Sequence, residues 1–324
     1  MSSPAPSPTL RDWCQLVRLP NVFTVIADTT AAFLLVAHSL VPLPRYGIVL
    51  AAVVCIYWAG MILNDVWDIE IDRQERSKRP LPAGKISLPA ARRAGWGLLI
   101  AGVALSFAVG FVPHGDTPPS LVPGGIAVLL AAMVVLYDGP VKRTPLAPMA
   151  MGLCRFFSFL LGASAAVTSV SEFPFVPPHV LGIAAGFGVY IVGVTCMARG
   201  EAVGGDKQKV PLIFGLVITI VGMAMIAGGP QFAPADAIAK FQIDPQRQFS
   251  LLIGLLAFTI IHRAFRAILN PEPYAIQMNI KHAILTIIPL AAAVALLSAG
   301  VLAGLMVFAL AVPAMTLGAF LRVT

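Results

Sequence analysis

Long apolar runs, separated by short polar turns, recur along almost the whole chain. A helix needs about 20 mainly apolar residues to cross a bilayer. Runs of that kind occupy roughly 20–41, 46–65, 89–112, 121–137, 146–169, 178–198, 209–229 and 248–269. The tail from 283 to 322 is apolar nearly throughout, as one long broken helix or as two helices that meet near Ser298 to Gly300. The sequence therefore predicts an all-α polytopic membrane protein, a bundle of nine or ten transmembrane helices.

Composition supports this prediction. Apolar residues make up 58% of the chain and charged residues 11%, where a soluble protein has about 25% charged residues. A soluble domain of this size has too little interior to bury so much apolar side chain, so an ordinary soluble enzyme is excluded. We expect a disordered tail rich in Ser and Pro over 1–10 and a single membrane domain over 11–324.

The net charge of +7 fits membrane topology better than nucleic-acid binding. All but four of the 22 Lys and Arg residues fall in the N-terminal segment, in the loops after the second, fourth, sixth and eighth apolar runs, or in adjoining helix ends. Arg45, Lys240 and Arg247 fall on the opposite side, and the side of Arg322 depends on the helix count. Because basic residues collect in cytoplasmic loops, we expect the N-terminus and these loops in the cytoplasm. The lipid bilayer is the expected partner; no nucleic acid or protein partner is indicated.

A cluster of acidic residues closes the second apolar run. Asn64, Asp68 and Asp72 are spaced i, i+4 and i+8, which places them on one face of a continuous helix. Like charges at this spacing repel one another, and a hard divalent cation with oxygen ligands would offset the repulsion. Together with Asp65, these residues are candidate Mg²⁺ ligands. The alternative is a solvated, charged helix end.

A basic run follows directly, with Arg73, Arg76, Lys78 and Arg79. Acidic metal ligands next to Arg and Lys suit a polyphosphate bridged by metal, because the basic side chains neutralise the phosphate oxygens that the metal leaves free. Positive-inside topology alone is the alternative explanation for these charges.

A second acidic cluster follows the sixth apolar run, where Glu201 and Asp206 are flanked by Arg199 and Lys207. It lies after an even-numbered helix, on the same side as the first cluster, so the two are able to meet at one cavity mouth. The sequence allows two interpretations of this segment: a second metal site or a simple polar turn.

The segment from Tyr137 to Arg143, after the fourth run, also lies on this side. The Tyr137 hydroxyl and the charges of Lys142 and Arg143 suit a phosphate. A turn with topology-setting charges is the alternative.

Polar residues also line the first apolar run. Asn21, Thr24 and Asp28 share one helix face, and Asp28 lies about 10 Å beyond Asn21 along the axis. A carboxylate at that depth needs a cavity or a partner, so this face is a candidate acceptor pocket. Arg155 is a candidate counter-charge, and a snorkelling interface residue is its alternative role.

Four of these segments together resemble the UbiA superfamily of intramembrane prenyltransferases. Asn64 to Asp72 resembles its Asn-Asp-x-x-Asp-x-x-x-Asp motif after the second helix, and Arg79 to Gly84 its Arg-Pro-Leu-Pro-x-Gly run. Tyr137 to Arg143 resembles its Tyr-x-x-Pro-x-Lys-Arg loop, and Arg18 to Asn21 its Arg-x-Pro-Asn opening of the first helix. The second motif departs from the family's Asp-x-x-x-Asp, because four residues separate Glu201 from Asp206. The run from Met197 to Glu201 resembles a divergent, ebo-cluster-type branch.

The resemblance implies Mg²⁺-dependent transfer of an isoprenyl group from a prenyl diphosphate to an aromatic or other lipophilic acceptor. The implied metal ligands are Asn64, Asp65, Asp68, Asp72, Glu201 and Asp206, and the implied catalytic residues are Asp68, Asp72, Arg79, Tyr137 and Lys142. Arg76, Arg79, Lys142, Arg143, Arg199 and Lys207 are implied to bind the diphosphate, with Asn21, Asp28 and Arg155 at the acceptor. A transporter or lipid-handling protein with a cation-binding acidic mouth is the alternative. Polar groups crowded at one membrane face, and not at the midplane, favour the enzyme.

Overall fold

The computed structural model describes residues 8–113, 118–167, 176–199 and 205–321, and within them all regular structure is helical. Ten helices or helix pairs are long and apolar enough to cross a membrane. They are α2 (Leu19–Ala37), α3 (Leu43–Trp67), α5 (Leu88–Val109), α6 (Val122–Leu136) continued by the short helix η1, α7 (Ala147–Ser164), α8 (Pro178–Ala198), α9 (Lys209–Gly228) with the short helices η2 and η3 at its ends, α11 (Gln248–Leu269), α12 with α13 (Pro273–Leu285, Ile287–Ala299) and α14 with α15 (Val301–Ala309, Ala311–Leu321). The shorter elements are α1 (Leu10–Leu16), α4 (Ile69–Glu75), η1 (Tyr137–Val141), η2 (Asp206–Gln208), η3 (Gly229–Phe232) and α10 (Ala235–Ile238).

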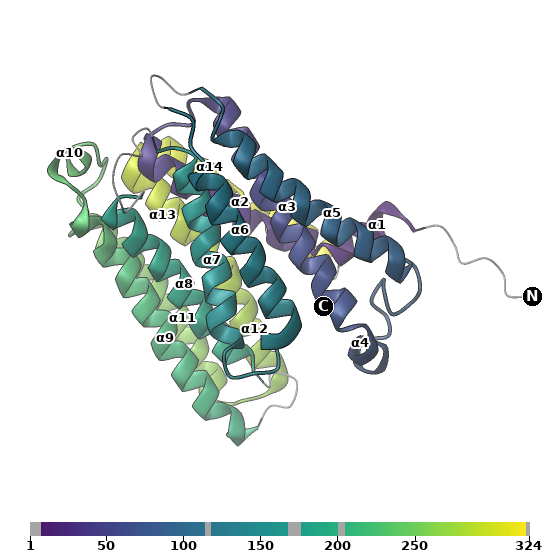
Figure 1. Cartoon of the computed structure of the whole chain (residues 1–324). Coiled ribbons are helices and arrows are strands. Elements are labelled where there is room, and N and C mark those ends of the chain that lie inside the picture. Colours follow the sequence, from purple (N-terminus) through teal and green to yellow (C-terminus); the bar gives the residue numbers. More distant parts are fainter. Residues whose placement is uncertain (1–7, 114–117, 168–175, 200–204, 322–324) are drawn as a thin grey trace, which may run out of the picture.

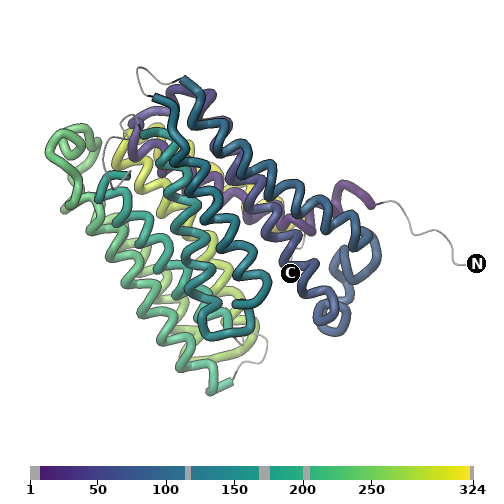
Figure 2. Tube along the Cα trace, in the orientation of Figure 1, coloured from purple at the N-terminus to yellow at the C-terminus, as the bar shows by residue number. Residues whose placement is uncertain are grey.

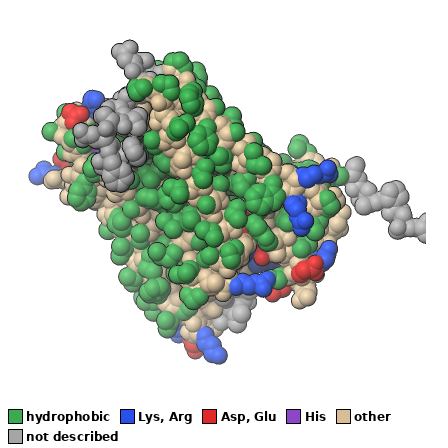
Figure 3. All heavy atoms as spheres, in the orientation of Figure 1, with side chains coloured by type: hydrophobic (Ala, Val, Ile, Leu, Met, Phe, Trp, Pro, Cys, Tyr) green, Lys and Arg blue, Asp and Glu red, His purple; other side chains and the backbone are tan. Residues whose placement is uncertain are grey.

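The described helices pack side by side in one bundle (Figures 1 and 2). Large side chains point outward along the spans; Ile100 and Leu302, for example, are 67% and 71% exposed. In Figure 3, hydrophobic side chains cover the middle of the visible face, whereas Lys, Arg, Asp and Glu gather toward its ends. A surface of this kind needs lipid as its solvent, so the protein is an integral, multi-pass membrane protein.

The apolar tail divides into two spans at Gly300, whose φ of +88° suits a residue without a side chain. The predicted break near Ser298 to Gly300 is confirmed, and the count is ten. The predicted start at 283 is wrong, because helix α12 begins at Pro273. Polar residues such as Gln277, Asn279 and Lys281 hide the first ten residues of the span from a hydropathy count.

The predicted tail 1–10 is one residue too long within the described part. Helix α1 begins at Leu10 because Thr9 and Asp12 form a capping box, in which the Thr9 side chain accepts from the Asp12 backbone N–H and Asp12 accepts in return. The Asp12 carboxylate also pairs with Lys85 at 3.1 Å, which holds α1 against the segment before α5. Residues 1–7 lie outside the described part.

The central helices approach closely where glycines face one another. A Cβ added to Gly193 on α8 would lie 2.5 Å from the backbone oxygen of Gly215 on α9. Small residues at such crossings let two backbones pack directly, as in other membrane bundles. This contact fixes α8 against α9.

Contacts across the loops confirm which of them share a side. Lys142 pairs with Asp68, Arg199 donates to the Thr144 carbonyl at 2.6 Å, and the backbone N–H of Gly205 donates to the Pro271 carbonyl at 2.8 Å. These contacts link the connections that follow the second, fourth, sixth and eighth spans. The Gln15 amide also donates to the carbonyl of Leu321 at 3.1 Å, so α15 ends next to α1.

The opposite end of the bundle has its own contacts. Arg45 donates to the carbonyls of Val112 and Ala165, at 2.8 and 3.3 Å. Nδ1 of His38 lies 3.0 Å from the Ser298 carbonyl. Helix α10 lies at this end in Figure 1, away from α4. Arg45, one of the few basic residues predicted on this side, is therefore buried as an internal tie.

Candidate active site

The acidic motif lies where α3 passes into α4. Helix α3 ends at Trp67, and Asp68 stands between the two helices with φ −86° and ψ 4°. Backbone hydrogen bonds from Asp68 to Asn64 (3.0 Å) and from Asp72 to Asp68 (2.8 Å) continue through this joint. The motif therefore stays nearly helical through the joint, and its side chains divide between two sets of partners.

Asn64 and Asp68 face η1. The Asn64 amide donates to Oδ1 of Asp138 at 2.8 Å, and Lys142 forms an ion pair and a hydrogen bond with Asp68. Tyr137 begins the same turn and is half-buried. The structure thus brings the predicted Tyr137 to Lys142 segment onto the predicted metal motif, although the two are more than 60 residues apart in sequence.

Asp138 is a site residue that the sequence reasoning did not select. Its side chain is 4% exposed, and its Oδ2 has no hydrogen-bond partner in the described part of the chain. A carboxylate at the end of an apolar helix, directly before Gly-Pro, was the available signal. Because a buried unpaired carboxylate oxygen is costly, this atom marks a position where a ligand would be stabilising.

Asp65 and Asp72 turn to the other side and share Arg79. Nη1 of Arg79 lies 2.9 Å from Oδ2 of Asp72 and 3.5 Å from Oδ1 of Asp65. Both residues are almost fully buried: Asp72 is 1% exposed and Asp65 is 3% exposed. Arg18 pairs with Asp65 at 3.1 Å and Arg76 with Asp72 at 3.7 Å. Arg18, visible in sequence only as part of the helix opening, is therefore a second site residue that the sequence pattern did not predict.

The turn from Pro80 to Gly84 explains how Arg79 reaches back. The backbone N–H of Lys85 donates to the Pro80 carbonyl at 3.0 Å, and Gly84 takes a φ of +71°. Both prolines and the glycine favour this compact reversal. The reversal returns the chain beside α4 and aims Arg79 at the two carboxylates.

The donor set suits Mg²⁺ in its chemistry. Asn64, Asp68, Asp72 and Asp138 supply only oxygen donors, which Mg²⁺ prefers, and Asp138 Oδ2 is buried and unpaired. No group of three acidic, His or Cys side chains converges on one point within the described residues; instead, Asp68 pairs with Lys142, and Asp65 and Asp72 pair with Arg79. These residues therefore fit a metal that arrives with an anionic ligand, since that ligand gives the cations new partners.

The remaining predicted diphosphate residues lie around this site with fewer contacts. Arg199 reaches Thr144 in the turn after η1. Arg143 and Lys207 are exposed and form no ion pair with any described residue. Asp206 is 89% exposed and pairs with Lys209 at 2.9 Å, so the structure does not bring it to the first motif. Glu201 lies outside the described residues, and the second metal site stays a prediction.

The predicted counter-charge for Asp28 is confirmed. Nη1 of Arg155, on α7, lies 2.7 Å from Oδ2 of Asp28 on α2, and Nη2 donates to Thr24 at 3.1 Å. Asp28 is fully buried, and its Oδ1 has no hydrogen-bond partner among the described residues. Asn21 takes part through its backbone, whose carbonyl accepts from Thr24 at 2.9 Å.

Comparison with known sequences gives a family match and several partial relatives. The sequence model described as the UbiA prenyltransferase family matches residues 25–265. Digeranylgeranylglyceryl phosphate synthase of Saccharolobus solfataricus is 33% identical over 138 residues, which cover 42% of this chain and 45% of that protein. The enzyme of the same name from Methanococcoides burtonii is 35% identical over 118 residues, 36% of this chain and 38% of that protein. The matched region thus spans less than half of each relative.

Solved structures share the fold over most of the chain. A structure of digeranylgeranylglyceryl phosphate synthase in membranes superposes with a TM-score of 0.64 at 22% identity, covering 90% of this chain and 99% of that one. A UbiA homologue from Archaeoglobus fulgidus bound to GPP and Mg²⁺ superposes with a TM-score of 0.57 at 15% identity, covering 85% and 99%. At these identities the likeness concerns the fold.

Proposed function

Because the chain belongs to the UbiA prenyltransferase family, we propose that it transfers an isoprenyl group from a prenyl diphosphate to a lipophilic acceptor, with Mg²⁺ as cofactor. The observation that carries the proposal is the joining of two distant segments, α3–α4 and η1, by the Asn64–Asp138 and Lys142–Asp68 contacts. Four carboxylates and four cations meet there at one end of an apolar bundle.

The cations would stabilise the leaving group. Arg76, Arg79 and Lys142 now neutralise protein carboxylates; with metal on the carboxylates, they are released to contact diphosphate oxygens. Arg143, Arg199 and Lys207 lie further out and would add charge. The Tyr137 hydroxyl would donate a hydrogen bond to the same group. Bound Mg²⁺ would add charge stabilisation of the developing pyrophosphate.

Reaction then follows from charge separation. The bond between the prenyl C1 and the diphosphate oxygen breaks, and its electron pair leaves with pyrophosphate. The resulting allylic cation is captured by the acceptor nucleophile, which loses a proton as the new bond forms. The apolar interior of the bundle would keep water away from the cation.

The Arg155–Asp28 pair is the proposed acceptor site. Its charged groups lie inside the bundle, with Asp28 Oδ1 open to accept a hydrogen bond from an acceptor hydroxyl. The sequence relatives are named as synthases of a glyceryl phosphate lipid, which favours a hydroxyl-bearing phosphate lipid over an aromatic acceptor. The ebo-cluster-type subgroup stays a prediction.

We further propose that the site faces the cytoplasm. The loops linked by Lys142, Arg199 and Gly205 carry most of the Lys and Arg residues, as the positive-inside rule requires of cytoplasmic loops. Labelling Lys78→Cys and Lys240→Cys with a membrane-impermeant maleimide in intact cells tests this. Only Lys240→Cys should react in a cysteine-free background.

The activity is tested with the full chain in proteoliposomes, labelled prenyl diphosphates and a glycerol phosphate lipid or an aromatic acid as acceptor. We expect Mg²⁺-dependent product and a loss of about 100-fold or more in Asp68→Ala, the scale typical of a removed electrostatic catalytic group. Glu70→Gln is the matched control, because Glu70 lies two residues away but is 77% exposed and pairs only with Arg73. If the purified protein binds no prenyl diphosphate and Asp68→Ala behaves like the wild type, the prenyltransferase hypothesis is refuted and the transporter hypothesis is left.

A further inference from the structure

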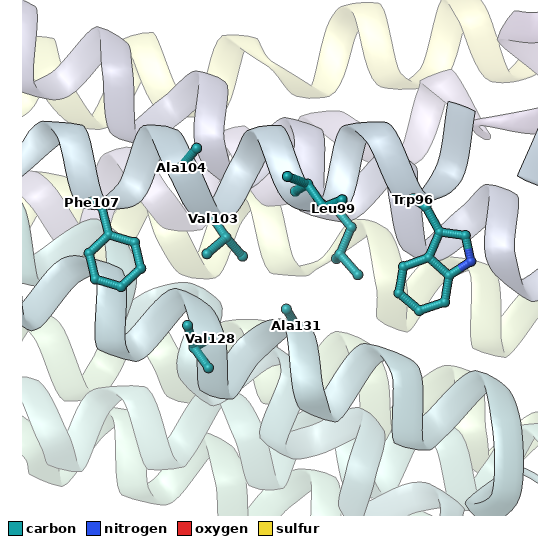
Figure 4. A pocket seen from close by; sticks show the side chains of 8 residues that line it. Trp96, Leu99, Val103, Ala104, Phe107, Val128 and Ala131 are labelled. Atoms are coloured by element: carbon teal, nitrogen blue, oxygen red, sulfur yellow. The ribbon is translucent and has the colours of Figure 1, made fainter. Parts of the chain in front are cut away.

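An apolar groove runs along the outside of the bundle between α5 and α6. It has a volume of about 420 Å³, and its lining includes Trp96, Leu99, Val103 and Phe107 on α5 and Val128 and Ala131 on α6. Figure 4 shows these side chains along one channel, with Trp96 at one end and Phe107 at the other. Leu99 forms the floor at 5% exposed, whereas Val128 is 48% exposed, so the groove opens toward lipid.

Along α5, the groove is about as long as half of the hydrocarbon core is thick. Trp96 and Phe107 are eleven residues apart on one helix, or about 16 Å at 1.5 Å per residue. Half of a hydrocarbon core of about 30 Å is about 15 Å. The Trp96 end lies at the membrane face of the candidate active site, because Trp96 packs edge-to-face on Trp67, with ring centroids 6.4 Å apart. Trp67 directly precedes Asp68, and Trp side chains prefer the headgroup level.

Two arginines lie near the Trp96 end of the groove. Arg92 and Arg93 precede Trp96 by about one helical turn and are both exposed. On α5 they share the helix stripe that continues through Trp96 and Ile100. Neither arginine forms an ion pair with another residue that the structure describes. Their charges are therefore available to an anionic group at the headgroup level.

We propose that this groove binds one acyl chain of an anionic phospholipid of the same leaflet, with its phosphate on Arg92 and Arg93. The apolar lining takes the chain, and the two guanidinium groups select the headgroup charge. The donor's proposed diphosphate site uses a different set of cations, which follow α4 and η1: Arg76, Arg79 and Lys142. The groove is thus a lipid site separate from the chemistry, and the inference stands whether or not the proposed function holds.

Quenching of Trp96 by lipids brominated in their acyl chains tests the proposal. The full chain is placed in phosphatidylcholine nanodiscs that contain equal fractions of brominated phosphatidylglycerol or brominated phosphatidylcholine. Trp96→Phe, measured in parallel, isolates the Trp96 contribution. We expect phosphatidylglycerol to quench Trp96 at up to about 25-fold lower mole fraction than phosphatidylcholine, about fivefold for each of the two charges. The Arg92→Gln/Arg93→Gln variant should abolish this preference.

Matched controls separate the groove from general charge attraction. Arg73→Gln/Lys78→Gln removes two exposed charges from the same membrane face and should keep the preference. Ala131→Phe, which fills the groove, should reduce quenching, and Leu129→Phe on the same helix should not. Equal quenching by both lipids in the wild type, or an equal loss in the Arg73/Lys78 control, overturns the proposal. Displacement by inorganic phosphate or by a prenyl diphosphate also overturns it, because the site would then bind a free headgroup anion or the donor.

Discussion

The buried pair of Arg155 and Asp28 allows stability and function to be separated. At 2.7 Å, two unit charges attract by roughly 6 kcal/mol at an effective dielectric constant of about 20. Desolvation costs several kcal/mol for each ion, so the pair as a whole contributes little net stability. Removal of one partner leaves the other charge buried and unpaired, which costs about 3–5 kcal/mol.

We therefore expect Arg155→Met and Asp28→Leu each to destabilise the protein by about 3–5 kcal/mol, and the double variant to recover most of that loss. Thermal unfolding in detergent, followed by circular dichroism, measures all three. Prenyl transfer behaves differently if the pair orients the acceptor: the double variant should fold and bind prenyl diphosphate, yet fail to form product.

Two results would refute this reasoning. If the double variant is as unstable as the sum of the single variants, the two charges are not coupled and the 2.7 Å contact carries no weight. If the double variant is stable and transfers the prenyl group at the wild-type rate, the pair is structural and the acceptor lies elsewhere. Asn21→Ala serves as a comparison, because Asn21 contributes only its backbone carbonyl to this cluster.

Three further predictions concern packing and caps. Gly193→Ala should destabilise the bundle by about 1–3 kcal/mol, because its Cβ would lie 2.5 Å from the backbone oxygen of Gly215. Gly254→Ala, which has open space around the added Cβ, should be neutral or stabilising by up to about 1 kcal/mol. The melting temperatures of the two variants test this difference. Arg45→Lys should lower the melting temperature, because a lysine cannot reproduce the forked donation to Val112 and Ala165; an unchanged temperature would show that this tie is dispensable. Hydrogen bonds from Thr9, together with Lys85, lower the pKa of Asp12. The cap on α1 therefore stabilises the helix fully at pH values above the ordinary Asp pKa. This stabilisation is lost as the pH falls through the lowered pKa of Asp12 in the folded protein. Limited proteolysis near α1 should therefore accelerate in acid, and Asp12→Asn should remove this pH dependence.

The sequence by itself determined the architecture, because crossing a bilayer is a local requirement. Each span must carry about 20 apolar residues and satisfy its own backbone hydrogen bonds, so the runs are legible one at a time. The sharp bias of Lys and Arg placed the loops on two sides, and the contacts of Lys142, Arg199 and Gly205 agree with that assignment. The largest boundary error, at Pro273, is where polar residues enter a span.

The tertiary structure decided how the site's side chains are partnered. Helical spacing predicted one face for Asn64, Asp68 and Asp72. It did not predict their partners: Asn64 and Asp68 contact residues of η1 and Lys142, which follows it, whereas Asp72 pairs with Arg79. Asp138 and Arg18 became site residues only when α3, η1 and the start of α2 met. Spacing along a helix fixes which side chains are neighbours within it, whereas helix packing, driven by shape and small residues such as Gly193 and Gly215, fixes which charges meet across helices.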